Sequence, residues 1–204
     1  MSPITKKRLF GIDRSGPPPV QTHSDQPLNP WTIPNAIGFT RLALIPVFLI
    51  VALGSEDGED ALAAVLFAVI GWADYLDGFA ARLTGQYSRL GALLDPIVDR
   101  LLVISGMAVC WKFELLPRWA IAIVIARELF MLALSRYGLR HGVELKINWP
   151  GRVGVAPTMG APFFAMAGVH WLALIMLYSG LTLALIATVL YVRDGLRQTR
   201  ARKA

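Results

Sequence analysis

Four aspartates lie between residues 74 and 99, in segments that otherwise have the composition of apolar helix: Asp74, Asp77, Asp95 and Asp99. A carboxylate at the centre of a helix in lipid costs about 3 kcal/mol on insertion scales, so such residues usually face the interior of a helical bundle and serve a function. Their spacing indicates which chemistry they could perform.

The spacing places the aspartates on two helical faces. Positions i, i+3, i+4 and i+7 share one face of a helix, and so do positions i, i+4 and i+8. The first face holds Asp74, Asp77, Gly78 and Ala81, and the second holds Gly91, Asp95 and Asp99. A short turn at residues 84–88 makes the two helices antiparallel neighbours. We therefore expect the four carboxylates to meet, about one or two helical turns below a membrane surface.

Four carboxylates at close quarters repel one another, and in a low dielectric they cannot all stay ionised without a cation. A divalent ion is the simplest solution, and hard oxygen ligands favour magnesium, manganese or calcium over zinc or copper. The histidines are too scattered to form a metal site: His23, His141 and His170. The alternative is a set of buried ion pairs that hold helices together, such as Asp77 with Arg82 or Asp99 with Arg100.

The composition indicates a polytopic membrane protein. Of 204 residues, 55% are apolar and 17% are charged, and the mean hydropathy is +0.52, well above that of a soluble domain. The net charge of +6 does not indicate nucleic acid, because the basic residues lie between apolar runs rather than on one face. The single cysteine, Cys110, lies in an apolar segment and is expected to be buried.

We predict an all-α protein with six transmembrane helices, each needing about 20 apolar residues. The predicted spans are 34–54, 60–83, 90–112, 117–140, 153–174 and 176–194. The segment LNPWTIPNAIGF before the first span suits a short interfacial piece at the lipid headgroups. Alternatively, Trp31 is simply an aromatic anchor at the start of the span. We divide the chain into a disordered cytoplasmic tail (1–27), a membrane domain (28–195) and a basic cytoplasmic C-terminal tail (196–204).

The distribution of lysine and arginine predicts the orientation, because short loops rich in these residues stay in the cytoplasm. Basic residues gather before the first span, in the second and fourth loops and after the last span, whereas the first loop, SEDGED, is acidic. Both termini and the aspartates are therefore expected on the cytoplasmic side of the cytoplasmic membrane.

Residues 74–99 read Asp-x-x-Asp-Gly-x-x-Ala-Arg, eight residues, then Gly-x-x-x-Asp-x-x-x-Asp. This pattern is similar to the signature of the CDP-alcohol phosphatidyltransferases, and all eight of its defined positions are filled. The resemblance extends to IPNAIGFTRLALIP at 33–46 and to IARELF at 125–130.

The resemblance implies transfer of a phosphatidyl group from CDP-diacylglycerol to an alcohol, with release of CMP. It implies two divalent ions, Mg²⁺ or Mn²⁺, held by the aspartates. Asp74, Asp77 and Asp95 would be metal ligands. Asp99 would lie close to the metals and act as the general base. The CDP site would be lined by Asp74, Gly78, Ala81, Arg82 and Gly91. By analogy, a homodimer is also expected.

The acceptor is less well defined by the sequence. Glycerol 3-phosphate, phosphatidylglycerol and inositol phosphate are all anionic, so each would need basic partners. Residues 127–154 resemble phosphatidylglycerophosphate synthases, which use glycerol 3-phosphate, and Arg127, Arg136 and Arg152 match basic positions there. Those enzymes typically carry a second basic residue two positions after Arg152, where this chain has Gly154. We take glycerol 3-phosphate as the leading acceptor and phosphatidylglycerol, which would give cardiolipin, as the alternative.

Two further alternatives are weaker. The alternative for Arg127 is an interior ion pair with its neighbour Glu128, and Arg140 and Lys146 read as ordinary loop charges.

An ion carrier is the non-enzymatic alternative, since intramembrane acids also mark transport paths. Transporters usually place such acids near the midplane between two related halves, and no such repeat is visible here.

Overall fold

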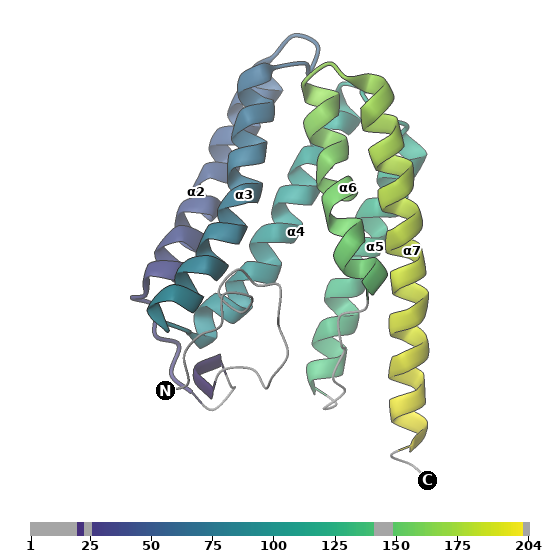
Figure 1. Ribbon diagram of the computed structural model, residues 1–204. Coiled ribbons are helices and arrows are strands. Elements are labelled where there is room, and N and C mark those ends of the chain that lie inside the picture. Colours follow the sequence, from purple (N-terminus) through teal and green to yellow (C-terminus); the bar gives the residue numbers. More distant parts are fainter. Residues whose placement is uncertain (1–19, 23–25, 141–148, 202–204) are drawn as a thin grey trace. The chain divides into compact units, whose positions relative to one another are not determined.

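The computed structural model describes residues 20–22, 26–140 and 149–201, and these residues form helices joined by short connections (Figure 1). Six α-helices and one 3-10 helix occur in the described part of the chain. Their bounds are η1 Val20–Thr22, α2 Ile33–Gly54, α3 Ala61–Thr84, α4 Arg89–Lys112, α5 Arg118–Arg140, α6 Trp149–Met166 and α7 His170–Ala201. The all-α prediction is confirmed, and the number of α-helices equals the number of predicted spans.

Side-chain caps fix where three of the helices begin. The backbone N–H of Asn35 donates to the Thr32 hydroxyl, that of Ala63 to the Asp60 carboxylate, and that of Gly91 to the Ser88 hydroxyl. Each cap satisfies one of the N–H groups that the first helical turn leaves without a helical partner. The turn between α3 and α4 is therefore short, as predicted, because α3 ends at Thr84 and the Ser88 cap starts α4 at once.

Among the described residues, three helical segments are both long and apolar enough to cross a membrane: Ile33–Gly54, Ala61–Thr84 and His170–Gly195. The other three predicted spans correspond to α4, α5 and α6. Helix α4 carries charges within its length, including Asp95, Asp99 and Arg100, and α6 has only 18 residues. That these three helices also cross the membrane remains a prediction.

The boundary between the last two predicted spans was wrong. The prediction placed it near residue 175, whereas α6 ends at Met166 and α7 begins at His170. Gly168 adopts a left-handed conformation with φ of 74°. The N–H of Val169 donates to the Phe164 carbonyl, and that of Gly168 to the Ala165 carbonyl. This is a Schellman turn, which ends a helix irrespective of hydropathy.

The predicted tails lie largely outside the described residues, as do His23, His141 and Lys146. Residues 26–32 precede α2 without forming a helix, and Trp31 there is 97% exposed. This arrangement agrees with an aromatic anchor at the start of α2. At the other end, α7 continues to Ala201, so the predicted C-terminal tail from residue 196 begins inside a helix.

The chain divides into two compact units, which we describe separately. Unit 1 contains residues 1–51 and 65–105, and unit 2 contains residues 52–64 and 106–204. In unit 1 the rings of Phe48 and Phe67 pack with centroids 5.5 Å apart, so α2 and α3 are in contact. In unit 2 α6 and α7 pack closely along their lengths, and α5 also contacts α7 (Figure 1). All eight signature positions belong to unit 1.

Candidate active site

Helices α3 and α4 bring the four predicted aspartates into one electrostatic cluster within unit 1. The charge of Asp74 acts on Asp77, Asp95 and Asp99, and the charge of Asp95 acts on Asp77. The helical spacing read from the sequence thus places these carboxylates together, as expected.

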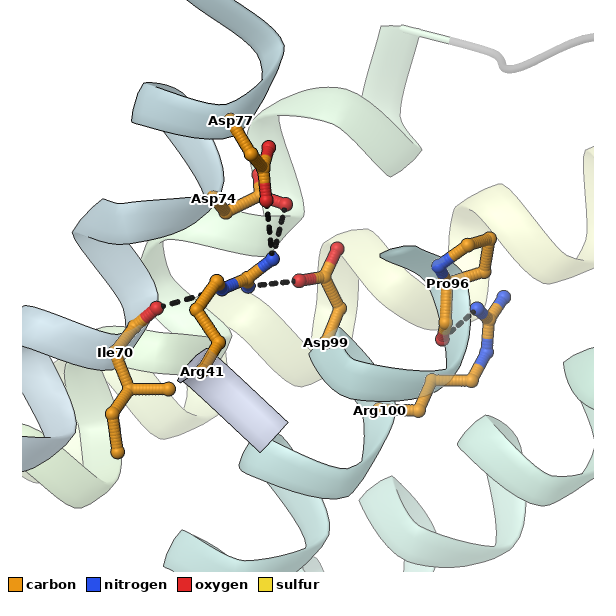
Figure 2. Close-up of polar contacts among 7 residues, drawn as sticks. All are labelled: Arg41, Ile70, Asp74, Asp77, Pro96, Asp99 and Arg100. Atoms are coloured by element: carbon orange, nitrogen blue, oxygen red, sulfur yellow. Dashed lines mark hydrogen bonds and ion pairs between the residues drawn. The ribbon is translucent and has the colours of Figure 1, made fainter. Parts of the chain in front are cut away.

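A guanidinium group from α2 lies among the carboxylates. Arg41 Nη1 is 3.0 Å from Asp74 Oδ1 and 3.1 Å from Asp77 Oδ2, and Arg41 Nη2 is 2.6 Å from Asp99 Oδ1. Arg41 Nε donates to the Ile70 carbonyl at 3.0 Å. Figure 2 shows the guanidinium between the aspartates of α3 and that of α4. One side chain therefore joins three helices at the point where the acids gather.

The cluster is buried on one side and accessible on the other. The Arg41 side chain is 1% exposed and that of Asp77 is 6% exposed, whereas Asp74 and Asp99 are 43% and 36% exposed. A ligand can therefore reach Asp74 and Asp99 without unfolding the helices, while Arg41 and Asp77 form the floor of the site.

Arg41 is not among the site residues predicted from the sequence. The signal was present, because Arg41 stands within an apolar span and an ionisable residue there is usually functional. The ion-pair alternative was correct in kind but named other partners: Asp77 and Asp99 pair with Arg41. Arg100 Nη1 instead donates to the Pro96 carbonyl at 2.8 Å, and its guanidinium points away from Asp99 (Figure 2).

Gly91 lies at a tight contact between α4 and the start of α2. A Cβ atom on Gly91 would stand 2.7 Å from Asn35 Oδ1 and 3.1 Å from the Ser88 hydroxyl. Asn35 is buried, accepts a hydrogen bond from Ser88 at 2.8 Å and donates to the carbonyls of Asn29 and Pro30. A side chain at position 91 would therefore collide with Asn35, which explains on packing grounds why glycine stands there. A role of Gly91 in donor binding remains a prediction.

Further hydrogen bonds attach the segment before α2 to the α3–α4 turn. The N–H of Ile33 donates to the Gln86 side chain, and the N–H of Leu90 donates to the Leu28 carbonyl. Arg89 Nη1 donates to the Gln26 carbonyl at 3.3 Å. These contacts hold the turn that sets the spacing of the two aspartate-bearing helices.

The other predicted donor-site residues lie at the end of α3 in the same unit. Gly78, Ala81 and Arg82 are partly exposed. A Cβ atom on Gly78 would be 3.2 Å from Arg82 Nη1, so the Arg82 side chain lies over Gly78. The Arg82 side chain thus turns back along α3 toward Gly78, which follows Asp77 in the signature.

The three predicted acceptor-site arginines belong to unit 2. Arg127 pairs with Glu128 and donates from Nε to the Thr188 hydroxyl at 3.1 Å, which is the interior ion pair named as its alternative. Arg136 is on α5, and its side chain lies outside the described part of the structure. Arg152 is exposed near the start of α6. Their role in acceptor binding remains a prediction.

The residues of the cluster fit a divalent ion in chemistry and charge. With all four carboxylates ionised, the single guanidinium of Arg41 would leave an excess of three negative charges, and carboxylate oxygens are the ligands that magnesium and manganese prefer. Within residues 26–140 and 149–201, no three acidic, histidine or cysteine side chains are already arranged around a metal position. In unit 1 a guanidinium lies among the acids instead.

A sequence profile of the CDP-alcohol phosphatidyltransferases matches residues 31–192. The chain belongs to the CDP-alcohol phosphatidyltransferase family. It is therefore an enzyme, a transferase of phospholipid biosynthesis, and with its apolar helices α2, α3 and α7 it is a membrane protein. The cluster around Arg41 contains the four acidic positions of the family signature.

Proteins similar to this CDP-alcohol phosphatidyltransferase have two different names. A cardiolipin synthase (CMP-forming) of Streptomyces coelicolor is 36% identical over 167 residues, which are 78% of this chain and 77% of that protein. A CDP-diacylglycerol--glycerol-3-phosphate 3-phosphatidyltransferase of Escherichia coli K12 is 31% identical over 182 residues, or 85% and 96% of the two chains. One with the same name from Bacillus subtilis is 30% identical over 135 residues, covering 60% and 70%.

Proposed function

We propose that this enzyme transfers the phosphatidyl group of CDP-diacylglycerol to phosphatidylglycerol, in a metal-dependent reaction that yields cardiolipin and CMP. The family supports the donor and the type of reaction. The observation that carries the choice of acceptor is the packing of Gly154, which changes the order of the two acceptors considered from the sequence.

Gly154 lies in the contact between α6 and α7. It is buried, and a Cβ atom there would be 3.1 Å from Leu183 Cβ and 3.6 Å from the Ala184 backbone nitrogen. A lysine at this position would have to separate the two helices. The second basic residue that phosphatidylglycerophosphate synthases typically carry at this position would therefore have no space between α6 and α7.

The charges of the two acceptors make this difference informative. Glycerol 3-phosphate is a phosphomonoester with close to two negative charges at neutral pH, whereas the phosphodiester of phosphatidylglycerol has one. A site with fewer cationic partners suits the diester better. The identity of 36% with the Streptomyces coelicolor cardiolipin synthase supports the same choice.

Glycerol 3-phosphate is the second candidate acceptor. The Escherichia coli relative named for this substrate aligns with 85% of this chain and with 96% of its own length. Arg152 is exposed near the start of α6 and is available to an anionic headgroup.

In the proposed reaction Asp74, Asp77 and Asp95 hold the metal, Mg²⁺ or Mn²⁺, as two ions. When bound, the metal neutralises the diphosphate and stabilises the leaving CMP. Asp99 accepts the proton of the acceptor hydroxyl, whose oxygen forms a bond to the phosphatidyl phosphorus as the bond from that phosphorus to CMP breaks. The 36% exposure of Asp99 leaves room for the acceptor, and the hydrogen bond from Arg41 orients its carboxylate.

We further propose that the enzyme lies in the cytoplasmic membrane with this site at the cytoplasmic side. Arg82 and Arg89 flank the α3–α4 turn, while the connection between α2 and α3 carries Glu56, Asp57 and Glu59. Basic short loops stay in the cytoplasm, where water-soluble CMP can leave and the diacylglycerol part can remain in the bilayer.

The experiment uses the purified full chain in detergent micelles with CDP-diacylglycerol and Mg²⁺. Phosphatidylglycerol, glycerol 3-phosphate and inositol phosphate are supplied separately, and CMP release and the lipid product are followed by mass spectrometry. We expect CMP release and cardiolipin formation when phosphatidylglycerol is supplied, and neither with the other two acceptors. Phosphatidylglycerophosphate from glycerol 3-phosphate, without cardiolipin, would contradict the acceptor while leaving the family reaction intact. The variant Asp57→Asn, in a loop outside the cluster, is the matched control for expression and folding.

A further inference from the structure

Arg41 occupies the position in unit 1 on which the acidic side chains converge. Its two Nη1 hydrogens have two partners, Asp74 and Asp77, and its Nε hydrogen is held by the Ile70 carbonyl. Nη2 is directed to Asp99. A guanidinium has five N–H donors in a fixed plane, so these four contacts fix both its position and its orientation.

We propose that Arg41 is the counter-cation of the metal-free aspartate cluster and that a divalent ion displaces its Nη1 from Asp74 and Asp77. This inference rests on the proposed metal dependence of the enzyme. Arg41 is accordingly a positioning residue, since it acts through the aspartates.

Shared oxygen atoms are the reason for the competition. Asp74 Oδ1 and Asp77 Oδ2 are both within 3.1 Å of Nη1. A divalent ion held by these same oxygens would compete with Nη1 for them, because carboxylate oxygens are the ligands that magnesium prefers. Two cations that share the same oxygens repel each other in a buried site, so binding of the metal through Asp74 Oδ1 and Asp77 Oδ2 would require Nη1 to withdraw.

The contact with Asp99 is made by a different nitrogen, Nη2, and is the shortest of the three ion pairs. Withdrawal of Nη1 from the α3 aspartates therefore need not break it. In the metal-loaded enzyme Arg41 keeps its contact with Asp99 and so continues to orient this carboxylate. The metal ion thus replaces the guanidinium at the α3 aspartates, Asp74 and Asp77, while the contact between Arg41 and Asp99 of α4 is kept.

Thermodynamic linkage predicts the direction in which a substitution of Arg41 changes the affinity for the metal. An interaction that stabilises the metal-free cluster more than the metal-bound cluster lowers the affinity for the metal. Removing the positive charge of Arg41 must then raise that affinity. A side chain that only ties helices together, or only arranges the aspartates for the metal, would leave the affinity unchanged or lower it on removal.

The experiment measures metal binding without substrate. The wild-type chain, Arg41→Gln, Arg41→Lys and the control Arg100→Gln are purified, treated with chelator and titrated with Mn²⁺. Free Mn²⁺ is measured by electron paramagnetic resonance, and thermal unfolding is followed in parallel with Mg²⁺. Arg100→Gln removes the same charge one residue from Asp99, from a side chain that points away from the cluster (Figure 2).

For Arg41→Gln we expect the dissociation constant for Mn²⁺ to fall about tenfold, together with a lower unfolding temperature in chelator and a larger increase on addition of Mg²⁺. Arg100→Gln should stay within about twofold of wild type, because its guanidinium points away from Asp99 and toward the Pro96 carbonyl (Figure 2). Arg41→Lys keeps the charge but cannot fork to two carboxylates, so its dissociation constant should fall by about two- to threefold.

An unchanged or weaker affinity in Arg41→Gln would overturn the proposal. If that variant does not fold, Arg41→Lys decides by the same criterion. Wild-type protein that binds no Mn²⁺ would also overturn it. The acceptor assay, repeated in chelator, then reports separately whether the proposed transfer needs a metal.

Discussion

Asp99 is the residue whose surroundings define its chemistry most closely. It is tied to Arg41 by a 2.6 Å contact and is still 36% exposed, so its carboxylate is oriented and reachable at once. A general base needs both properties, since it must stand within hydrogen-bonding distance of the proton that it accepts. Asp77 is also oriented by Arg41, but at 6% exposure its carboxylate is not reachable.

Replacing Asp99 by asparagine should lower kcat about 10²- to 10⁴-fold, because the amide keeps the shape and a hydrogen-bond acceptor for Arg41 but cannot take up the proton. CMP release under saturating donor and acceptor is the measurement, and the unfolding temperature shows whether the protein is intact. Turnover within tenfold of wild type, in folded protein, would remove Asp99 from the role of base.

The helical period alone was sufficient to predict that Asp74, Asp77, Asp95 and Asp99 form one cluster, because a short turn leaves two helices few ways to pair. An ionisable residue within an apolar span marks Arg41 as a candidate, but the helical period could not predict its aspartate partners, because the sequence of α2 does not indicate which of its faces meets α3. The packing role of Gly91 was equally hidden, since it depends on Asn35, which is distant in sequence.

At the scale of the helices, small residues determine how closely α6 and α7 approach. A Cβ atom on Gly180 would be 2.8 Å from both the backbone nitrogen and the hydroxyl of Thr158, and one on Gly160 would be 3.3 Å from Met176 Sδ. Without large side chains the backbones come close enough for dispersion contacts along the whole pair. The glycines thus make this close contact possible.

Gly180→Ala should destabilise the protein by about 1–3 kcal/mol, because the methyl group would meet backbone atoms that cannot rotate away. The matched control is Gly38→Ala in the interior of α2, where a Cβ atom meets nothing within 4 Å. The control should be neutral or stabilising by about 0.5–1 kcal/mol through helix propensity. Denaturant unfolding in detergent measures both, and equal stability of the two variants would contradict the close contact.

Helix boundaries in this region show why hydropathy was insufficient. Residues 153–194 are almost continuously apolar, so hydropathy gives no sign of a break at Gly168. The break is set by a left-handed backbone conformation, which glycine adopts without strain. Gly180, also in an apolar setting, remains helical, and only the conformation distinguishes the two glycines.

At the scale of the whole molecule, the two kinds of residue assigned to the reaction lie in different compact units. The predicted metal and donor positions belong to unit 1, and the predicted acceptor positions Arg127, Arg136 and Arg152 belong to unit 2. The sequence signature covers residues 74–99, all in unit 1, and this is why it predicts the chemistry of the donor better than the identity of the acceptor.

Chelation of divalent ions should stop CMP release and lower the unfolding temperature, and Mg²⁺ should restore both. A ligand that binds only the folded state stabilises it by mass action, and without the ion the cluster keeps its excess of negative charge. Full turnover in the presence of chelator would contradict the proposed metal dependence. The same titration with Zn²⁺ tests the preference for hard oxygen ligands.

The predicted orientation can be tested by cysteine labelling in intact cells. Cys110 is buried and is the single natural cysteine, so background labelling should be low. A cysteine introduced for Glu56 should react with a membrane-impermeant maleimide from outside, whereas one introduced for Thr84 should react only after the membrane is permeabilised. The reverse pattern would invert the topology.

The position of Arg41 in α2 has a consequence for biosynthesis. Chains emerge from the ribosome from the N-terminus, so the guanidinium of α2 leaves the ribosome before the carboxylates of α3 and α4. In the proposed topology each acid that follows can meet a positive charge that is already present, and its insertion penalty is reduced. The order of helices along the gene would thus favour insertion of an acidic hairpin that is poorly tolerated alone.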